Sequence, residues 1–378
     1  MRNGLKIIDV DVHVNEPPEM WQSYIELKYK ERAPRMVKDA HGFNTLLIDN
    51  KHYYRSWGLN ADVAEDFRRL GRERYGEEAD EYIDFIMPGN PKLTCEDLEQ
   101  AGIDIAFMYA SQGFYAAFCD GMDPKLAAAT CRAYNNWLAD FCRYDSSKLR
   151  GVIVVNLIDP EGAVEELKRG VNELGMRAVV TRPNRVNGRN LGDKAHSKFW
   201  ETCEDLGVTV SLHVATHAFV PETGADYFKT RLQKHTCSHP LEQQMGMLSL
   251  ITDGVMERHP GIKFGFLESG CGWLPYWLWR MDMEYEKNRH EAPYLTMKPS
   301  EYFKRQGFIN MEPEEPYLEH LVQYVGEDKI LFSSDYPHLD HPWPEAMEEV
   351  DEVNIPEPVR KKWLWDNPIE FYGIKDTV

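Results

Sequence analysis

Eight short apolar segments recur along the sequence, and helical patterns separate most of them. They are residues 6–13, 103–109, 151–156, 177–182, 208–213, 262–268, 307–311 and 329–334. Nearly all are apolar on both faces, a pattern typical of strands in a parallel sheet that is covered by helices. Eight strand–helix units predict an α/β fold of the closed (β/α)8 (TIM) barrel type. An open doubly wound sheet is the less favoured alternative, because the sequence contains neither GxGxxG nor GxxxxGK[ST].

The interval between the first two predicted strands, residues 14–100, is far longer than a single helical crossover requires. It contains LLIDNKHYY, in which Asp49–Asn50 suits a tight hairpin turn. It also contains a charged run over residues 66–82, which is typical of a solvent-exposed helix face. We therefore expect one metal-dependent barrel domain over residues 1–378, with residues 14–100 inserted as a cap over the barrel mouth.

Charge and cysteine content restrict the partners and the compartment. The chain carries 43 basic and 62 acidic side chains, a net charge of −19, and so acidic a surface repels nucleic acids and anionic membranes. No stretch approaches the ~20 apolar residues of a membrane span, and Asp9 and Asp11 come too early for the apolar run of a signal peptide. The seven cysteines are scattered without a C-x-x-C pair, which is typical of reduced thiols. We expect a cytoplasmic protein.

Metal-binding residue types stand at the ends of several otherwise apolar strands. Asp11 and His13, two residues apart, point to the same side of the first strand. His213 ends the fifth strand, Glu268 ends the sixth, and Asp335 directly follows the eighth. Because barrel strands share one direction, these ends meet at one rim, where active sites of this fold lie. Taken singly, each residue has a structural alternative, such as a turn, a helix cap or a satisfied core histidine. Their coincidence predicts a metal site.

Further donors surround these positions. His239 lies beyond the fifth strand, and His338 follows Asp335 by three residues. The predicted metal ligands are Asp11, His13, His213, His239, Glu268, Asp335 and His338, and the predicted catalytic residues are Glu268, Asp335 and His239. One catalytic zinc usually takes three protein ligands plus water. The surplus therefore fits either outer partners around one ion or two ions of iron, manganese or zinc.

Three residues near the rim are predicted to contact a small-molecule substrate. Arg182 and Asn184 follow the fourth strand, and His217 lies four residues beyond His213. The Arg182 guanidinium suits a substrate carboxylate or phosphate, although a salt bridge to a rim carboxylate is an equal alternative. His217 suits a second ligand, a substrate contact or an ordinary loop position.

At these residues the chain resembles the amidohydrolase superfamily. The resemblance is to the amidohydrolase-related group that includes aminocarboxymuconate-semialdehyde decarboxylase and the dihydroxybenzoate-type decarboxylases. It runs nearly end to end through the segments IIDVDVHVNEPPEMW, GIDIAFMYAS, YNNWLADFC, RAVVTRPN, VSLHVATH, FGFLESGCGWLPYWLWRMD, LFSSDYPH and DNPIEFYGI. It implies a barrel of the amidohydrolase type with a metal site.

The chain departs from this group at three positions. Asp11-Val12-His13 stands where many members carry H-x-H or E-x-A, and Thr181-Arg182 stands where two-metal hydrolases often carry a carboxylated lysine. Glu268 stands where the decarboxylases carry a histidine that looks like their proton-handling residue. The D-x-H, E-S-G-x-G-W-L-P-Y and S-S-D-Y-P-H motifs resemble a branch that includes dinuclear non-haem iron monooxygenases.

On this resemblance we favour a monooxygenase with two irons, which uses dioxygen to hydroxylate a small organic or acyl-CoA substrate. The first alternative is a mononuclear metal-dependent hydrolase or decarboxylase, with zinc or manganese as possible metals. The second is a non-catalytic subunit that supports such an enzyme. We expect a homo-oligomer or a hetero-oligomer of related subunits.

Overall fold

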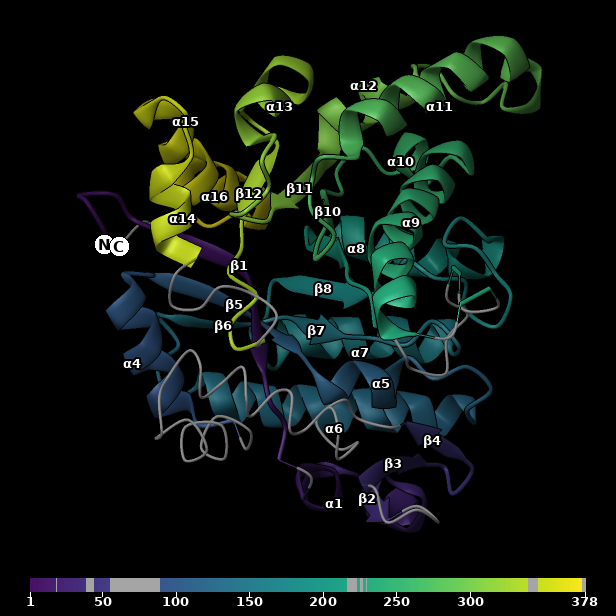
Figure 1. Ribbon diagram of the computed structural model, residues 1–378. Coiled ribbons are helices and arrows are strands. Elements are labelled where there is room, and N and C mark those ends of the chain that lie inside the picture. Colours follow the sequence, from purple (N-terminus) through teal and green to yellow (C-terminus); the bar gives the residue numbers. More distant parts are fainter. Residues whose placement is uncertain are drawn as a thin grey trace.

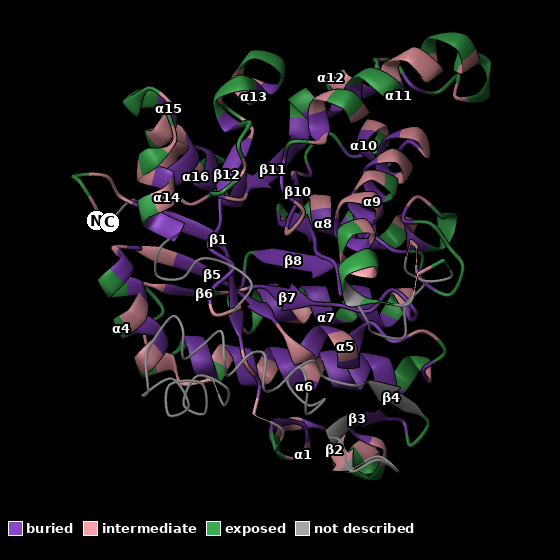
Figure 2. Ribbon diagram, in the orientation of Figure 1, coloured by how far each residue is buried: buried purple, intermediate pink, exposed green. Residues whose placement is uncertain are grey.

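The strands β1 and β5–β12, whose bounds are given below, occupy the centre of the molecule, and helices surround them (Figure 1). The computed structural model describes residues 1–17, 19–38, 44–54, 89–215, 223–224, 227–228, 230–338 and 346–375. Colouring by burial shows the central strands almost entirely buried, whereas the surrounding helices expose their outer faces (Figure 2). This distribution explains why the strand segments are apolar on both faces.

The central strands follow one another around a barrel in chain order. They are β1 (Ile8–Val14), β5 (Ile105–Ala110), β6 (Leu149–Gly151), β7 (Ile153–Val154), β8 (Ala178–Thr181), β9 (Thr209–Leu212), β10 (Phe264–Phe266), β11 (Gly307–Met311) and β12 (Ile330–Phe332). They form two parallel sheets, β1-β5-β6 and β7-β8-β9-β10-β11-β12. β6 and β7 are parts of one strand, because the intervening Val152 N–H still donates to the Met108 carbonyl on β5.

Hydrogen bonds between β1 and the segment after β12 join the two ends of the strand series. The Asp335 N–H donates to the Asp11 carbonyl over 3.2 Å, and the His13 N–H donates to the Tyr336 carbonyl over 2.6 Å. The eight strands predicted from the sequence are therefore present, and the barrel prediction is confirmed. β1 is irregular, because its pairing register with β5 shifts between Asp9 and Val12.

Helices fill the connections between strands. They are α1 (Met20–Tyr24), η1 (Leu27–Arg32), α4 (Pro91–Ala101), α5 (Gln112–Ala117), α6 (Pro124–Cys142), α7 (Pro160–Asn172), η4 (Lys194–His196), α8 (Ser197–Leu206), α9 (Arg231–Thr252), α10 (Val255–Arg258), α11 (Leu274–Asn288), η5 (Arg289–Glu291), α12 (Pro299–Gln306), α13 (Leu318–Val325), α14 (Ala346–Glu352), α15 (Glu357–Lys361), η6 (Lys362–Asp366) and α16 (Asn367–Tyr372). Their ends follow local chemistry. Asp159 caps α7 by accepting from the Gly162 N–H, and Gly207 ends α8 in the left-handed region at φ 61°.

A small antiparallel sheet lies in the long interval after β1. It consists of β2 (Arg35–Lys38), β3 (Asn44–Ile48) and β4 (His52–Tyr54). Asp49 and Asn50 connect β3 to β4 with φ values of 54° and 55°, so the predicted hairpin turn is confirmed. Residues 55–88, which include the charged run 66–82, lie outside the described residues.

All seven cysteines are free thiols, and six of them are buried, which agrees with the prediction of reduced core residues. Among the described helices, none combines the length and the apolar character that crossing a membrane requires.

Candidate metal centre at the barrel rim

Three of the predicted ligands converge at the carboxyl ends of β1 and β9. The donor atoms of Asp11, His13 and His213 lie within 4.8 Å of one another, and all three residues are buried. The two imidazole Nε2 atoms are 3.1 Å apart. The Asp11 carboxylate lies 3.5 Å from each of them, through Oδ1 to His13 and through Oδ2 to His213.

The hydrogen bonds of the two imidazoles fix which nitrogen of each ring faces inward. His13 Nδ1 lies 2.8 Å from the Ala110 carbonyl, and His213 Nδ1 lies 2.7 Å from the Val214 carbonyl. A carbonyl only accepts, so each Nδ1 carries its proton, and in the neutral rings each Nε2 offers a lone pair. Two lone pairs that face each other across 3.1 Å repel unless a cation or a proton lies between them.

The carboxylate in this cluster also lacks hydrogen-bond donors. Neither oxygen of Asp11 accepts a hydrogen bond from the described residues, although both are fully buried. Buried polar atoms are normally hydrogen-bonded, and an exception calls for an explanation such as an absent ion. Carboxylate oxygens and imidazole nitrogens are ligands for zinc and manganese. The residues present therefore fit a divalent metal ion.

Asp335 and His338 extend the cluster from the end of β12. Asp335 Oδ1 lies 3.1 Å from His13 Nε2, and the donor atoms of His13, Asp335 and His338 form a second group within 4.8 Å. His338 Nδ1 lies 3.0 Å from the Asp335 carboxylate, and its Nε2 lies 3.3 Å from the hydroxyl of Ser111. Both nitrogens of His338 therefore have protein partners in this arrangement.

Glu268 and His239 form a pair at the edge of this centre. Glu268, directly beyond β10, places Oε2 3.1 Å from His213 Nε2 and Oε1 3.5 Å from Nε2 of His239 on α9. Neither residue belongs to the two compact donor groups found among the described residues. Burial raises the pKa of the Glu268 carboxyl, but His213 and His239 outweigh it and hold this pKa well below its usual range. Burial likewise opposes the charge on His213, yet Glu268 and Asp11 raise the pKa of its imidazole to about 9.

The two acidic strand-end residues share a rare backbone conformation. Glu268 has φ 51° and Asp335 has φ 53°, in the left-handed region that residues other than glycine seldom adopt. Such strain is typical of functional sites, where the surrounding structure holds it in place.

Two further buried carboxylates, Asp9 and Glu16, bind the backbone of loops beside the metal centre. Asp9 accepts from the Ser334 and Asp11 N–H groups, each over 3.2 Å, and burial raises its pKa to about 8. Glu16 accepts from three backbone N–H groups of residues 111–113 at 2.9–3.1 Å. Burial outweighs these bonds and raises the pKa of Glu16 to about 7. Asp9 links β1 to the loop after β12, and Glu16 links the segment after β1 to the loop after β5.

The predicted substrate contacts have other partners in the structure. Arg182 is buried, and its terminal nitrogens donate to the carbonyls of Phe118 and Arg185 and to the Asp120 carboxylate. Asn184 is buried and hydrogen-bonds the side chain of Glu242 on α9. His217 lies outside the described residues. Direct contact of these residues with a substrate stays a prediction.

Sequence reasoning assigned no role to Gln243, which lies on α9 four residues after His239. Its side-chain amide donates to the Leu212 carbonyl over 2.7 Å and to the Leu267 carbonyl over 2.8 Å. The sequence signal that could have identified Gln243 is its spacing of four residues from His239, which places both side chains on one face of the helix.

The sequence profile of the amidohydrolase family matches residues 8–374. The chain belongs to the amidohydrolase family. It is 24% identical over 291 residues to 2-amino-3-carboxymuconate-6-semialdehyde decarboxylase from Dictyostelium discoideum, covering 75% of this chain and 77% of that protein. It is 28% identical over 269 residues to gamma-resorcylate decarboxylase from Polaromonas sp. (strain JS666 / ATCC BAA-500), covering 67% of this chain and 78% of that protein.

Solved structures of similar proteins share the amidohydrolase fold. An amidohydrolase from Mycobacterium avium subsp. paratuberculosis K-10 superposes with a TM-score of 0.79 at 24% identity, covering 98% of this chain and 99% of that one. The 5-carboxyvanillate decarboxylase from Novosphingobium aromaticivorans DSM 12444, complexed with manganese, superposes with a TM-score of 0.70 at 19% identity, covering 99% and 97%.

These relatives overturn the interpretation of the chain as a two-iron, dioxygen-dependent monooxygenase, because both curated relatives are decarboxylases. That interpretation was based on the resemblance of the D-x-H, E-S-G-x-G-W-L-P-Y and S-S-D-Y-P-H motifs, the second of which contains Glu268, to a branch with dinuclear iron monooxygenases. Among the described residues, however, Glu268 belongs to neither compact donor group, and both groups share His13. The presence of a glutamate at this position does not by itself identify the reaction.

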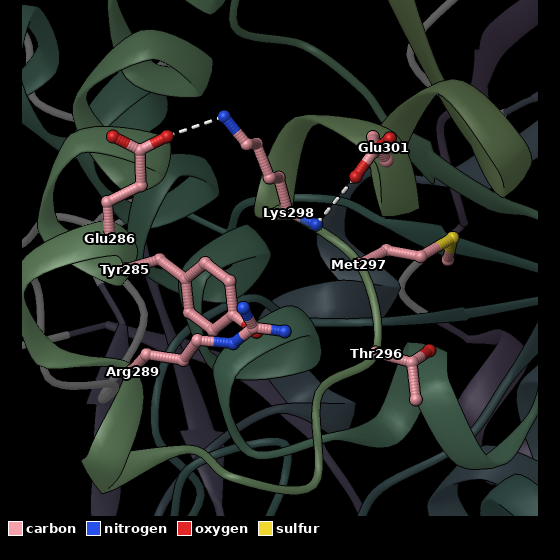
Figure 3. A pocket seen from close by; sticks show the side chains of 7 residues that line it. All are labelled: Tyr285, Glu286, Arg289, Thr296, Met297, Lys298 and Glu301. Atoms are coloured by element: carbon pink, nitrogen blue, oxygen red, sulfur yellow. Dashed lines mark hydrogen bonds and ion pairs between the residues drawn. The ribbon is translucent and has the colours of Figure 1, made fainter.

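A separate cavity of about 350 Å³ lies at the carboxyl end of α11 (Figure 3). Tyr285, Arg289, Met297 and Lys298 are among the residues that line it. Lys298 pairs with Glu286 over 2.5 Å, and its backbone N–H donates to Glu301 over 2.8 Å. No predicted site residue lines this cavity, so it is distinct from the metal centre.

Proposed function

We propose that this protein is a metal-dependent decarboxylase that removes carbon dioxide from a small aromatic or unsaturated carboxylic acid. The observation that carries the proposal is the cluster of Asp11, His13 and His213, whose inward-facing donors fit one divalent cation. The decarboxylases among its relatives support the reaction type.

We propose that Asp11, His13, His213 and Asp335 would hold the ion. Manganese is a fitting metal, because it accepts mixed carboxylate and imidazole ligands, and the similar 5-carboxyvanillate decarboxylase was crystallised with manganese. The bound cation would supply positive charge that fixes the oxygens of the substrate. The proposed set leaves out Glu268, His239 and His338, which the sequence also predicted as ligands, and the metal content of His239→Gln tests this choice for His239.

Decarboxylation requires a proton at the carbon atom that loses the carboxylate. Where the relatives that this chain resembles have a histidine after the sixth strand, this chain has Glu268. His213, at 3.1 Å, belongs to the proposed metal ligands, and His239 on α9, at 3.5 Å, places a second imidazole beside Glu268. We propose that the protonated imidazole of His239 donates a proton to that carbon, and that Glu268, whose Oε1 lies 3.5 Å from His239 Nε2, orients the ring. The electrons of the broken C–C bond stay on the ring as CO2 leaves, and water returns the proton to His239.

Apolar side chains enclose the imidazoles of the centre. The Phe114 ring lies 4.7 Å from the ring of His213 and meets the ring of His13 edge-on at 6.2 Å. Phe118 stacks on Phe114 with ring centroids 5.0 Å apart. Exclusion of water by such rings strengthens the attraction between bound charges.

We further propose that residues 14–100 form a cap on this barrel and contribute to substrate binding. Glu16 binds the backbone at the start of α5, and Arg32 donates to Asp49 and to Asp123. Asp123 lies between α5 and α6, in the connection that follows the carboxyl end of β5. These contacts support the proposal that residues 14–100 attach to the rim that carries the metal centre.

The test is decarboxylation in D2O by the manganese-loaded protein. With 2,6-dihydroxybenzoate and 5-carboxyvanillate as probes, we expect CO2 release and one deuterium at the carbon that loses it. His239→Gln should lower kcat by about 10²–10⁴-fold, the usual contribution of a positioned general acid, while manganese content stays near that of the parent. His320→Gln is the matched control, since His320 is exposed on α13. Metal-loaded protein that released no CO2 from these or other aromatic and unsaturated acids would contradict the proposal.

A further inference from the structure

Gln243 joins the ends of two barrel strands through one side chain. It is fully buried on α9, which lies beside β10 (Figure 1). Its Nε2 donates to the carbonyls of Leu212 and Leu267 at 2.7 and 2.8 Å. Its Oε1 accepts no hydrogen bond from the described residues. The two donated bonds are therefore its principal polar contacts.

The two carbonyls belong to the residues that immediately precede His213 and Glu268. Each carbonyl lies in the same planar peptide unit as the N–H of the next residue. The hydrogen bond to the Leu212 carbonyl therefore fixes the orientation of the peptide unit that joins Leu212 to His213. The bond to the Leu267 carbonyl fixes the peptide unit between Leu267 and Glu268 in the same way. The Leu267 N–H also donates to the Leu212 carbonyl over 3.1 Å, so these bonds form one connected unit.

We propose that Gln243 is a positioning residue for the metal centre and the proton-handling pair, an inference that rests on the proposed function. One face of α9 sets the place of three groups: it carries His239 directly, and through Gln243 it holds His213 and Glu268. This linkage keeps Glu268 within 3.1 Å of His213 and 3.5 Å of His239. Outer partners of this kind commonly decide metal affinity, because they hold the ligands in geometry.

The chain contains a matched control at the opposite end of β10. Gln306 on α12 is also buried, and its Nε2 donates to the carbonyls of His259 and Ile262 at 3.0 and 2.8 Å. These carbonyls precede the amino end of β10, away from the metal centre. Gln306 also accepts from the Arg305 guanidinium, so its replacement removes more hydrogen bonds than replacement of Gln243.

The experiment compares Gln243→Met with Gln306→Met in the full chain. Methionine has a similar length and no donor, so each variant loses its two bonds to carbonyls. We expect Gln243→Met to weaken Mn²⁺ binding by about 10–100-fold, the usual effect of losing an outer partner, and to shift the visible absorption of bound Co²⁺. Gln306→Met should lower the Tm at least as much, yet retain the Mn²⁺ affinity and Co²⁺ spectrum of the parent.

The outcomes separate this inference from the proposed function. If Gln243→Met binds Mn²⁺ as the parent does, or if both variants lose affinity equally, the positioning role is wrong. If the parent binds Mn²⁺ and Gln243→Met alone loses affinity, the role stands even where no acid is decarboxylated. A parent that binds no Mn²⁺ overturns both. Should Gln243→Met not fold, Gln243→Asn and Gln306→Asn give the same comparison, because the shorter amide cannot reach both carbonyls.

Discussion

The carboxyl end of the barrel holds unsatisfied and strained acidic residues, whereas buried amides at its amino end bind backbone carbonyls. At the carboxyl ends of the strands, Asp11 is buried with no hydrogen-bond donor among the described residues, and Glu268 and Asp335 have left-handed backbones. At the amino ends, the buried amides of Gln306 and Asn367 each donate to two backbone carbonyls. A protein tolerates such unsatisfied and strained groups where function requires them. The comparison indicates that one end is built for binding and the other for stability.

The largest expected effect is at the binding end. His213→Ala removes an imidazole whose Nε2 faces His13 at 3.1 Å. We expect bound Mn²⁺ to fall severely and turnover to fall by at least about 10³-fold, because a catalytic cation contributes several kcal/mol and each ~1.4 kcal/mol is tenfold. Elemental analysis and CO2 release measure the two effects.

The matched control for this variant is His259→Ala. His259 is also buried, but it pairs with Glu204 over 2.9 Å near the amino end of β10. Its loss should lower the free energy of unfolding and leave the metal content unchanged. Equal metal content in His213→Ala and in the parent would show that the centre is wrongly placed.

The next effect, on the pH dependence of stability, follows from the raised pKa values at the same end. Burial raises the pKa of Asp9 to about 8 and that of Glu16 to about 7, and the carboxylates beside His213 raise its pKa to about 9 against the effect of burial. Between pH 6.5 and 9 the metal-free folded chain therefore holds more protons than the unfolded chain, and its stability falls as the pH rises. The lowered pKa of Glu268 has no influence in this window, because Glu268 is ionised in both states.

We expect the Tm of the metal-free protein to fall by roughly several degrees from pH 6.5 to 9. The rise in Tm on adding Mn²⁺ should grow over the same range, because metal ligands bind in their deprotonated forms. Asp9→Asn should reduce the fall in Tm between pH 6.5 and 9, because asparagine does not titrate. Thermal scans of metal-free protein that show greater stability at pH 9 than at pH 6.5 would contradict the assigned pKa directions.

The sequence was informative about the fold because strand identity is local. Runs that are apolar on both faces mark buried parallel strands, and the shared direction of such strands brings His213 and Asp335 to one rim without knowledge of any distance. The spacing of two between Asp11 and His13 likewise predicted a common side, and the two side chains do lie 3.5 Å apart.

Other features of the rim depend on tertiary distances that no local pattern contains. The two bonds of Gln243 join residues 24 and 31 positions away in the chain. The left-handed backbone of Glu268 and the pairing of His338 with Ser111 are likewise results of packing. The reaction class was the hardest feature to predict, because three short motifs favoured an oxygenase, whereas the curated relatives are decarboxylases.

The smallest effect is expected from a variant at the stability end. Asn367, at the start of α16, is buried and donates from Nδ2 to the carbonyls of Glu327 and Ile330, each over 2.8 Å. Asn367→Leu leaves both carbonyls without this donor, so the free energy of unfolding should fall by about 1–3 kcal/mol. Mn²⁺ affinity, kcat and KM should stay those of the parent, because neither of these two bonds reaches a rim residue. Denaturant titration measures the first quantity, and metal titration with steady-state kinetics measures the others. A changed KM or Mn²⁺ affinity in folded Asn367→Leu would show that the two ends of the barrel are coupled, and the division of roles between them would then be wrong.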